Sequence, residues 1–132
     1  MKKNSYAEHV ERLVAEHGLT VTPHSRGGRA FKRRKEIAIR PVKTAITYAV
    51  ALHEIGHLLG RQPRARLERE AAAWMWARAN AISWTDTMQA KMQSCLSSYA
   101  KTAQRRIMYG RPYAHSRLFY ALLDSKVKTN AA

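Results

Sequence analysis

Hydrophobic and polar positions in the first third of the chain predict one helix followed by short strands. Apolar residues recur at helical spacing from Ser5, whose side chain we expect to cap the helix, until Gly18. Segments 19–23 and 36–40 then have the composition and the bounding prolines that are typical of strands, with a turn at 26–29 between them. We therefore expect a small antiparallel sheet after the helix.

The rest of the chain has the longer apolar periodicity of helices. A run of small and apolar residues begins at Thr44 and predicts a buried helix that ends at Gly60. A second helix is predicted over residues 64–81, a third runs to about Tyr109, and a last one begins at Pro112. The predicted fold class is α+β, in which an N-terminal helix and a small sheet precede a helical C-terminal half.

The most informative segment is H-E-I-G-H at residues 53–57, late in the helix that begins near Thr44. His53 and His57 lie one helical turn apart, so both imidazoles project from one face with Cβ atoms about 5–6 Å apart. Glu54 points about 100° around the helix, which suits a general base beside a zinc-bound water better than it suits a third ligand. The segment predicts a catalytic zinc site with both histidines as ligands.

A catalytic zinc ion usually has three protein ligands, so a third must lie further along the chain. The metzincin pattern H-E-x-x-H-x-x-G-x-x-H would require a histidine where this chain has Pro63. The next helix offers Glu68 and Glu70 instead. Residues two apart on a helix diverge by about 200°, so only one of these carboxylates is expected to face the metal.

These segments resemble the ImmA/IrrE metallo-endopeptidases, which have H-E-x-G-H followed on the next helix by E-x-E-A-x-x-F-A. Residues 53–57 and 68–75 have that order and spacing, and the resemblance covers roughly residues 5–80. It implies a small zincin-like domain in which Glu70 is the third zinc ligand. It also implies an endopeptidase that cleaves a specific regulatory protein, such as a DNA-binding repressor, in a bacterium or its phage.

In the expected mechanism, zinc polarises the scissile carbonyl and lowers the pKa of its water, while Glu54 takes the water's proton and delivers it to the leaving amine. The composition offers Tyr109, Tyr113 and His115 as donors to the tetrahedral oxyanion. The strand over 36–40 directly precedes the motif helix. Its free edge is expected either to pair with an extended substrate peptide above the zinc or to be a protected structural edge.

Length and composition favour a single domain over residues 1–132, with a core over about 5–80 and a helical extension over about 84–125. No stretch approaches the roughly 18 apolar residues that a membrane span needs, and the N-terminus lacks an apolar signal core. The one cysteine, Cys95, agrees with a reducing compartment. We therefore expect a cytoplasmic protein without membrane contact.

The formal charge of +15, from 24 lysines and arginines against nine acidic residues, is the second strong feature. It favours an anionic partner, either nucleic acid or an acidic protein. Two basic groups could form a phosphate-binding surface without sequence preference, through Arg33, Arg34, Lys35, Arg105 and Arg106. The charge also supports an alternative function, a basic nucleic-acid-binding or repressor-binding module whose metal site is not catalytic.

Overall fold

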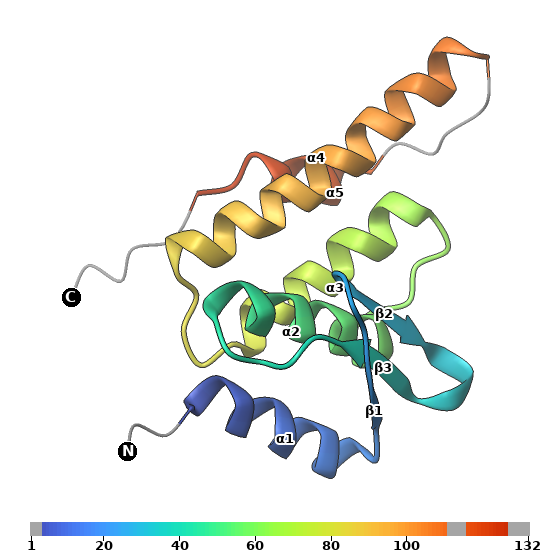
Figure 1. Cartoon of the computed structure of the whole chain (residues 1–132). Coiled ribbons are helices and arrows are strands. Elements are labelled where there is room, and N and C mark those ends of the chain that lie inside the picture. The colour runs from blue at the N-terminus through green and yellow to red at the C-terminus, as the bar shows by residue number, and fades with distance from the viewer. Residues whose placement is uncertain (1–3, 111–115, 127–132) are drawn as a thin grey trace.

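The computed structural model describes residues 4–110 and 116–126. Within them the chain forms five α-helices and a three-stranded sheet, which is the α+β class predicted from the sequence (Figure 1). In chain order the elements are α1 (Ser5–His17), β1 (Thr20–Pro23), β2 (Gly28–Phe31), the 3-10 helix η1 (Lys32–Arg34), β3 (Glu36–Ile39), α2 (Ala45–Leu59), α3 (Arg66–Asn80), α4 (Asp86–Met108) and α5 (Arg117–Leu123). None of the described helices is long and apolar enough to cross a membrane.

Helix α1 is capped one residue earlier than the sequence predicted. The side-chain oxygen of Asn4 accepts a hydrogen bond from the backbone N–H of Ala7 at 3.2 Å, so Asn4 is the N-cap and Ser5 is already helical. At the other end Gly18 has φ 61°, a left-handed conformation that favours glycine. The cap predicted at Ser5 is therefore wrong, because the neighbouring Asn4 also has an oxygen that can accept the bond.

The sheet is mixed, which corrects the prediction of an antiparallel sheet. Its strand order is β1-β3-β2, with β1 parallel and β2 antiparallel to the central strand β3. The predicted turn at 26–29 is wrong in its second half, because Gly28 and Arg29 begin β2. The chain passes from β1 to the opposite edge of the sheet, turns through η1 to Lys35 at φ 48°, and returns between the two strands. This return makes the β1–β3 pairing parallel.

Helix α2 is the centre of the fold. It begins after its N-cap Thr44 and packs against α1, α3, α4, β2 and β3 (Figure 1). Between Tyr48 and Gly56 every residue except Val50 is buried. A helix covered on nearly all sides is expected to be apolar all round. The buried polar side chains in this stretch therefore call for a role other than core packing.

Gly56 allows α2 and α3 to approach closely. A Cβ atom at this position would overlap the carbonyl oxygen of Ala73 and would lie 3.1 Å from its carbonyl carbon. Both atoms belong to the backbone of α3, so rotation of a side chain could not relieve the overlap. The glycine within H-E-I-G-H thus sets the separation of the two helices.

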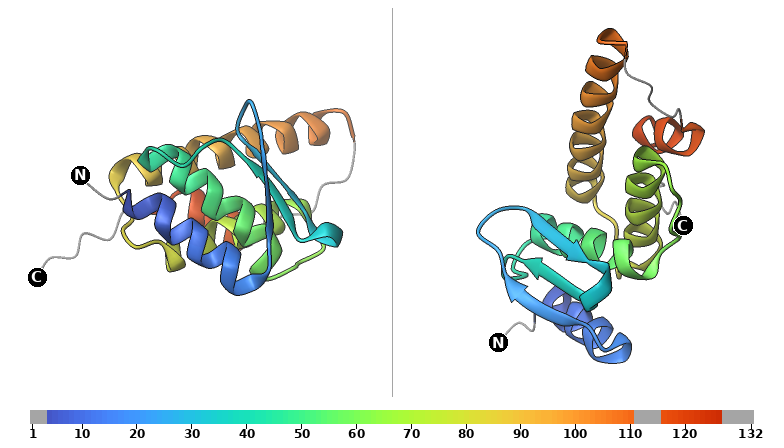
Figure 2. Two further views of the ribbon diagram at one scale, coloured as in Figure 1. Left: turned by 60° about the horizontal axis from the view of Figure 1, so that its bottom comes forward. Right: turned by 90° about the vertical axis from the view of Figure 1, so that its right-hand side faces the viewer.

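Helices α4 and α5 complete the C-terminal half. Helix α4 packs against α2 and α3, and α5 packs against α3 and α4. The far end of α4 extends beyond the other helices (Figure 2). Thr85 caps α4, and Ser116 caps α5 by accepting a hydrogen bond from the backbone N–H of Phe119 at 3.1 Å. The predicted start of the last helix at Pro112 lies outside the described residues.

Candidate metal centre

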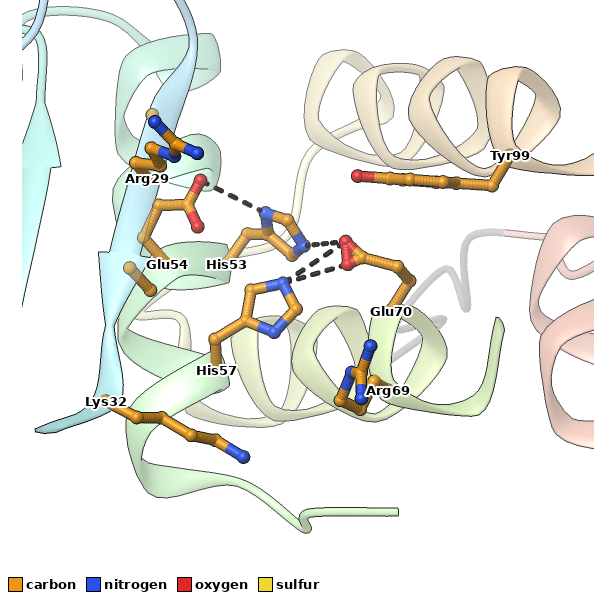
Figure 3. A pocket seen from close by; sticks show the side chains of 10 residues that line it. Arg29, Lys32, His53, Glu54, His57, Arg69, Glu70 and Tyr99 are labelled. Atoms are coloured by element: carbon orange, nitrogen blue, oxygen red, sulfur yellow. Dashed lines mark hydrogen bonds and ion pairs between the residues drawn. The ribbon is translucent and has the colours of Figure 1, made fainter. Parts of the chain in front are cut away.

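Three potential metal ligands converge between α2 and α3. His53 and His57 project from one face of α2 towards Glu70 of α3 (Figure 3). His57 Nε2 lies 2.9 Å from Glu70 Oε2, and His53 Nε2 lies 3.6 Å from Glu70 Oε1. The ligand atoms of all three side chains lie within 4.8 Å of one another, so the group is close enough to hold one metal ion.

His53 is fixed in orientation, yet one of its nitrogens lacks a partner. Its ring stacks on Trp74 of α3, with 4.2 Å between the ring centroids and 13° between the planes. Its Nε2 atom is buried and has no hydrogen-bond partner among the described residues, because 3.6 Å to Glu70 is too long for a hydrogen bond. Such an atom typically costs about 1–3 kcal/mol. A metal bound at Nε2 would remove this cost, so the orphaned nitrogen indicates that the cluster suits a metal ion.

The carboxylate of Glu70 is held in its ionised form. Burial alone would raise its pKa, but the imidazoles of His53 and His57 outweigh burial and hold this pKa well below its usual range. The ionised carboxylate is the form that binds a cation. Glu68, the other candidate from the sequence, lies outside the group of potential ligands in the described part of the chain.

Glu54 is buried beside this group without belonging to it. Its Oε2 atom lies 3.7 Å from His53 Nδ1. Burial raises the pKa of Glu54 above its ordinary value, and the nearby imidazoles of His53 and His57 offset only part of that rise. A carboxyl group with a raised pKa is a stronger base, which is the property that the sequence argument required of Glu54.

The edge strand β2 passes close to Glu54. A Cβ atom at Gly28 would lie 2.9 Å from both Cγ and Oε2 of Glu54 and 3.2 Å from Cγ1 of Val50. Strand β2 therefore borders the site, and the expectation that the strand over 36–40 does so is wrong. That segment forms β3, which is paired on both sides and has no free edge.

An open cleft of about 390 Å³ lies above the potential ligands and is lined by residues of β2, η1, α2, α3 and α4. Two parts of the cleft are named here by their residues. The floor consists of His53, Glu54, His57 and Glu70, and the mouth consists of Arg29, Lys32 and Arg69 (Figure 3). The floor thus contains the carboxylates and imidazoles, and the mouth contains cations. A cleft of this size is large enough for a small ligand or a short segment of peptide.

No family model, curated protein or solved structure matches the chain. The resemblance to the ImmA/IrrE peptidases therefore rests on the motif residues alone. The two segments that carry the resemblance, 53–57 and 68–75, contain the three potential ligands. The activity that the resemblance implies is a proposal.

Tyr99 of α4 is a cleft residue that sequence reasoning missed. Its hydroxyl points into the cleft, towards the region of His53 and Glu70 (Figure 3). Burial raises the pKa of Tyr99, and the Glu70 carboxylate raises it further, so the hydroxyl stays protonated and can act as a donor. In the sequence Tyr99 shares a helical face with Leu96 and Ala103, both buried. That spacing indicates a core residue, and no local signal shows that this face meets the cleft.

Of the three oxyanion donors expected from composition, only Tyr109 lies in the described part of the chain, and it is not found in the cleft. Tyr109 is 79% exposed at the end of α4 and does not line the cleft. The reason is the length of α4, which carries its last turn beyond the other helices (Figure 2). Tyr113 and His115 lie outside the described residues.

Proposed function

We propose that the chain is a zinc-dependent endopeptidase that cleaves a regulatory protein, such as a DNA-binding repressor. The observation that carries the proposal is the buried carboxylate of Glu54, which lies next to the three potential ligands without being one of them. A structural zinc site fills all four positions with protein ligands. A site with three ligands and an adjacent base leaves a position open for water or substrate, as hydrolytic zinc sites do.

The donor set fits zinc. Two imidazoles and one carboxylate form a ligand combination that is known in zinc peptidases, and zinc bound to them would act as a Lewis acid that polarises a carbonyl and makes water acidic near neutral pH. The Nε2 atom of His53 is unpartnered, and the carboxylate of Glu70 is held in the ionised form that binding requires. His57 is less buried and faces the cleft.

The side chains around the ligands have distinct tasks in this proposal. Oε2 of Glu54 accepts a proton from the attacking water and returns it to the amine nitrogen, so the peptide C–N bond breaks without a net change in protons on the enzyme. Tyr99 is a positioning residue, since its hydroxyl faces Glu70 and orients this ligand carboxylate. Trp74 holds the ring of His53 by stacking.

Strand β2 can align an extended substrate. One of its edges pairs with β3, and the other is a free edge of the sheet. A peptide that pairs with this edge gains main-chain hydrogen bonds that do not depend on its side chains. Because Gly28 of β2 touches the region of Glu54 and Ala30 lines the cleft, such a peptide would pass over the floor.

Metal content tests the site. Elemental analysis of metal-replete protein is expected to give about one zinc ion per chain in the wild type, as three-ligand sites hold. Glu70→Ala is expected to lose most of this zinc. Glu68→Ala is the matched control, because it removes the same group two residues earlier on α3 from a position outside the potential ligands.

Glu54→Gln separates chemistry from metal binding. This variant is expected to keep its zinc while cleavage of a pool of quenched fluorescent peptides falls about 100-fold or more, the usual contribution of a general base. Cleavage by Glu54→Gln at the wild-type rate would contradict the proposal. Wild-type protein that contains no zinc would also contradict it, and would favour the basic nucleic-acid-binding module instead.

A further inference from the structure

Three cations surround the entrance of the cleft on different sides. Arg29 lies on β2 at the end of the cleft near Glu54, and Lys32 lies on η1 at the other end (Figure 3). Arg69 of α3 lies across the cleft from them. Arg29 and Lys32 are three residues apart, a span of up to about 10 Å in extended chain. Cations therefore flank the floor at both ends along the direction of β2.

These cations are not neutralised by the protein itself. No salt bridge joins Arg29, Lys32 or Arg69 to an acidic side chain in the described part of the chain. Arg69 donates a hydrogen bond to the backbone carbonyl of Arg64 at 3.2 Å, which leaves its charge uncompensated.

The neighbouring Arg34 gives a contrast within the same hairpin. Its guanidinium lies 3.5 Å from the Glu36 carboxylate and 4.3 Å from the centroid of the Phe31 ring. Arg34 is thus paired with an acidic side chain, and it does not line the cleft. Arg29 also lies over the Phe31 ring, 5.8 Å from its centroid, but no salt bridge joins it to a carboxylate among the described residues. Within the cleft, the charges of the mouth cations therefore remain available to an anionic ligand.

We propose that this cleft selects a peptide segment with acidic side chains on both sides of the bond that is cleaved. The inference rests on the proposed function, because it names the substrate class of the same site. An extended peptide on the free edge of β2 would run past Arg29 and Lys32, so its acidic side chains would meet one cation before and one after the floor. Complementary charge of this kind contributes to selection and to the rate of association.

A peptide fits this cleft better than a nucleic acid does. The free edge of β2 presents N–H donors and C=O acceptors in alternation, which a peptide backbone matches and a phosphodiester backbone, with acceptors only, does not.

Binding to zinc-loaded Glu54→Gln protein tests the selection without cleavage. The probes are two fluorescein-labelled peptides of equal length, one with glutamates and one with lysines around the same central alanines, and a single-stranded oligonucleotide. Fluorescence anisotropy is expected to show at least about tenfold tighter binding of the glutamate peptide than of the lysine peptide. Tighter binding of the oligonucleotide than of the glutamate peptide would overturn the proposal.

A pair of variants with equal charge change separates the mouth from the general charge of the protein. Arg29→Glu/Lys32→Glu is expected to weaken binding of the glutamate peptide about 30-fold, whereas Arg33→Glu/Lys101→Glu, which changes two exposed cations outside the cleft, weakens it about threefold at most. Equal weakening in both variants would overturn the proposal. The single variants Lys32→Ala and Arg33→Ala repeat this comparison of cleft and surface cations with a smaller change of charge.

Cleavage by the zinc-loaded wild type distinguishes this inference from the proposed function. Faster hydrolysis of the glutamate peptide supports both. Equal hydrolysis of the two peptides would overturn the charge selection and leave the peptidase standing. Selective binding of the glutamate peptide without any hydrolysis would support the charge selection and contradict the peptidase. A result with neither selective binding nor hydrolysis would overturn both proposals.

Discussion

The floor of the cleft is carried by two helices that pack through buried residues, whereas its mouth belongs mainly to an edge strand and a 3-10 turn with exposed side chains. At the floor, His53, Glu54 and Glu70 are each less than a tenth exposed. At the mouth, Arg29 and Lys32 are exposed. Burial strengthens each electrostatic interaction at the floor. It also makes each unpaired polar group there costly, because such a group is shielded from water.

The contrast indicates a division of tasks. The floor fixes the protonation states and positions that metal binding and proton transfer require, so its geometry has little freedom. The mouth decides which ligand enters, and its charges can change with little effect on stability, because exposed cations contribute little to folding. Four substitutions test this division: they change, in turn, the packing beneath the floor, the junction between floor and mouth, a single hydrogen-bond donor, and the charge of one floor carboxylate.

Gly56→Ala is expected to have the largest effect. The added Cβ would overlap the backbone carbonyl of Ala73, so α2 and α3 must move apart and the potential ligands on them must separate. We expect the free energy of unfolding to fall by about 3 kcal/mol, the upper range for overpacking of a core, and zinc binding to be lost. Urea unfolding of the metal-free protein measures the first effect, and elemental analysis measures the second.

Gly27→Ala is the matched control for this substitution. A Cβ at Gly27 would meet nothing within 4 Å. Its stability is expected to stay within about 1 kcal/mol of the wild type, as for a glycine whose conformation alanine can adopt. Similar stability of Gly56→Ala and Gly27→Ala would show that the two helices can separate without cost.

The same contrast explains what could be predicted from the sequence. The i, i+4 spacing of His53 and His57 is set by one helix, so local geometry was enough to place both on one face. Glu70 follows after a short connection on the next helix, and the choice of Glu70 over Glu68 came from the resemblance. Strand β2 was mistaken in part for a turn, because its position depends on a pairing with β3 that no local pattern specifies. The place of Tyr99 likewise depends on how α4 packs on α2.

Gly28→Ala tests the junction between floor and mouth. The new methyl group would press on Cγ and Oε2 of Glu54, each 2.9 Å from the Cβ position, and would displace the carboxylate. We expect kcat for a cleaved peptide to fall about 100-fold, as misplacement of a reacting group by about 1 Å does, while zinc content stays unchanged. Gly27→Ala, one residue earlier, again provides the control. Unchanged kcat in Gly28→Ala would mean that Glu54 does not act from the position seen here.

Tyr99→Phe removes one donor above the floor. Because the hydroxyl faces Glu70, its loss is expected to leave this carboxylate less well oriented and to lower zinc affinity about tenfold. Competition with a coloured chelator measures the affinity, and the melting temperature of the metal-free protein should change little. Tyr109→Phe is the control, since Tyr109 is exposed at the end of α4. A loss of stability without a loss of affinity would make Tyr99 a packing residue.

Glu54→Gln is expected to change the stability of the metal-free protein modestly, and in the opposite direction to Gly56→Ala. Burial raises the pKa of Glu54 in the folded protein, so its contribution to stability is present below the ordinary value of 4.5 and is lost as the pH rises through the folded value. At pH 7 the carboxylate is ionised in the unfolded metal-free chain, so folding costs either burial of that charge or uptake of a proton. Glutamine carries neither cost, and Glu54→Gln should be more stable by about 1 kcal/mol. The difference should vanish near pH 4, and Glu68→Gln, outside the floor, should show no such gain. Thermal melts of both variants across this pH range measure it, and a lower stability of Glu54→Gln at pH 7 would mean that contacts with the floor histidines outweigh the cost of burying the carboxylate.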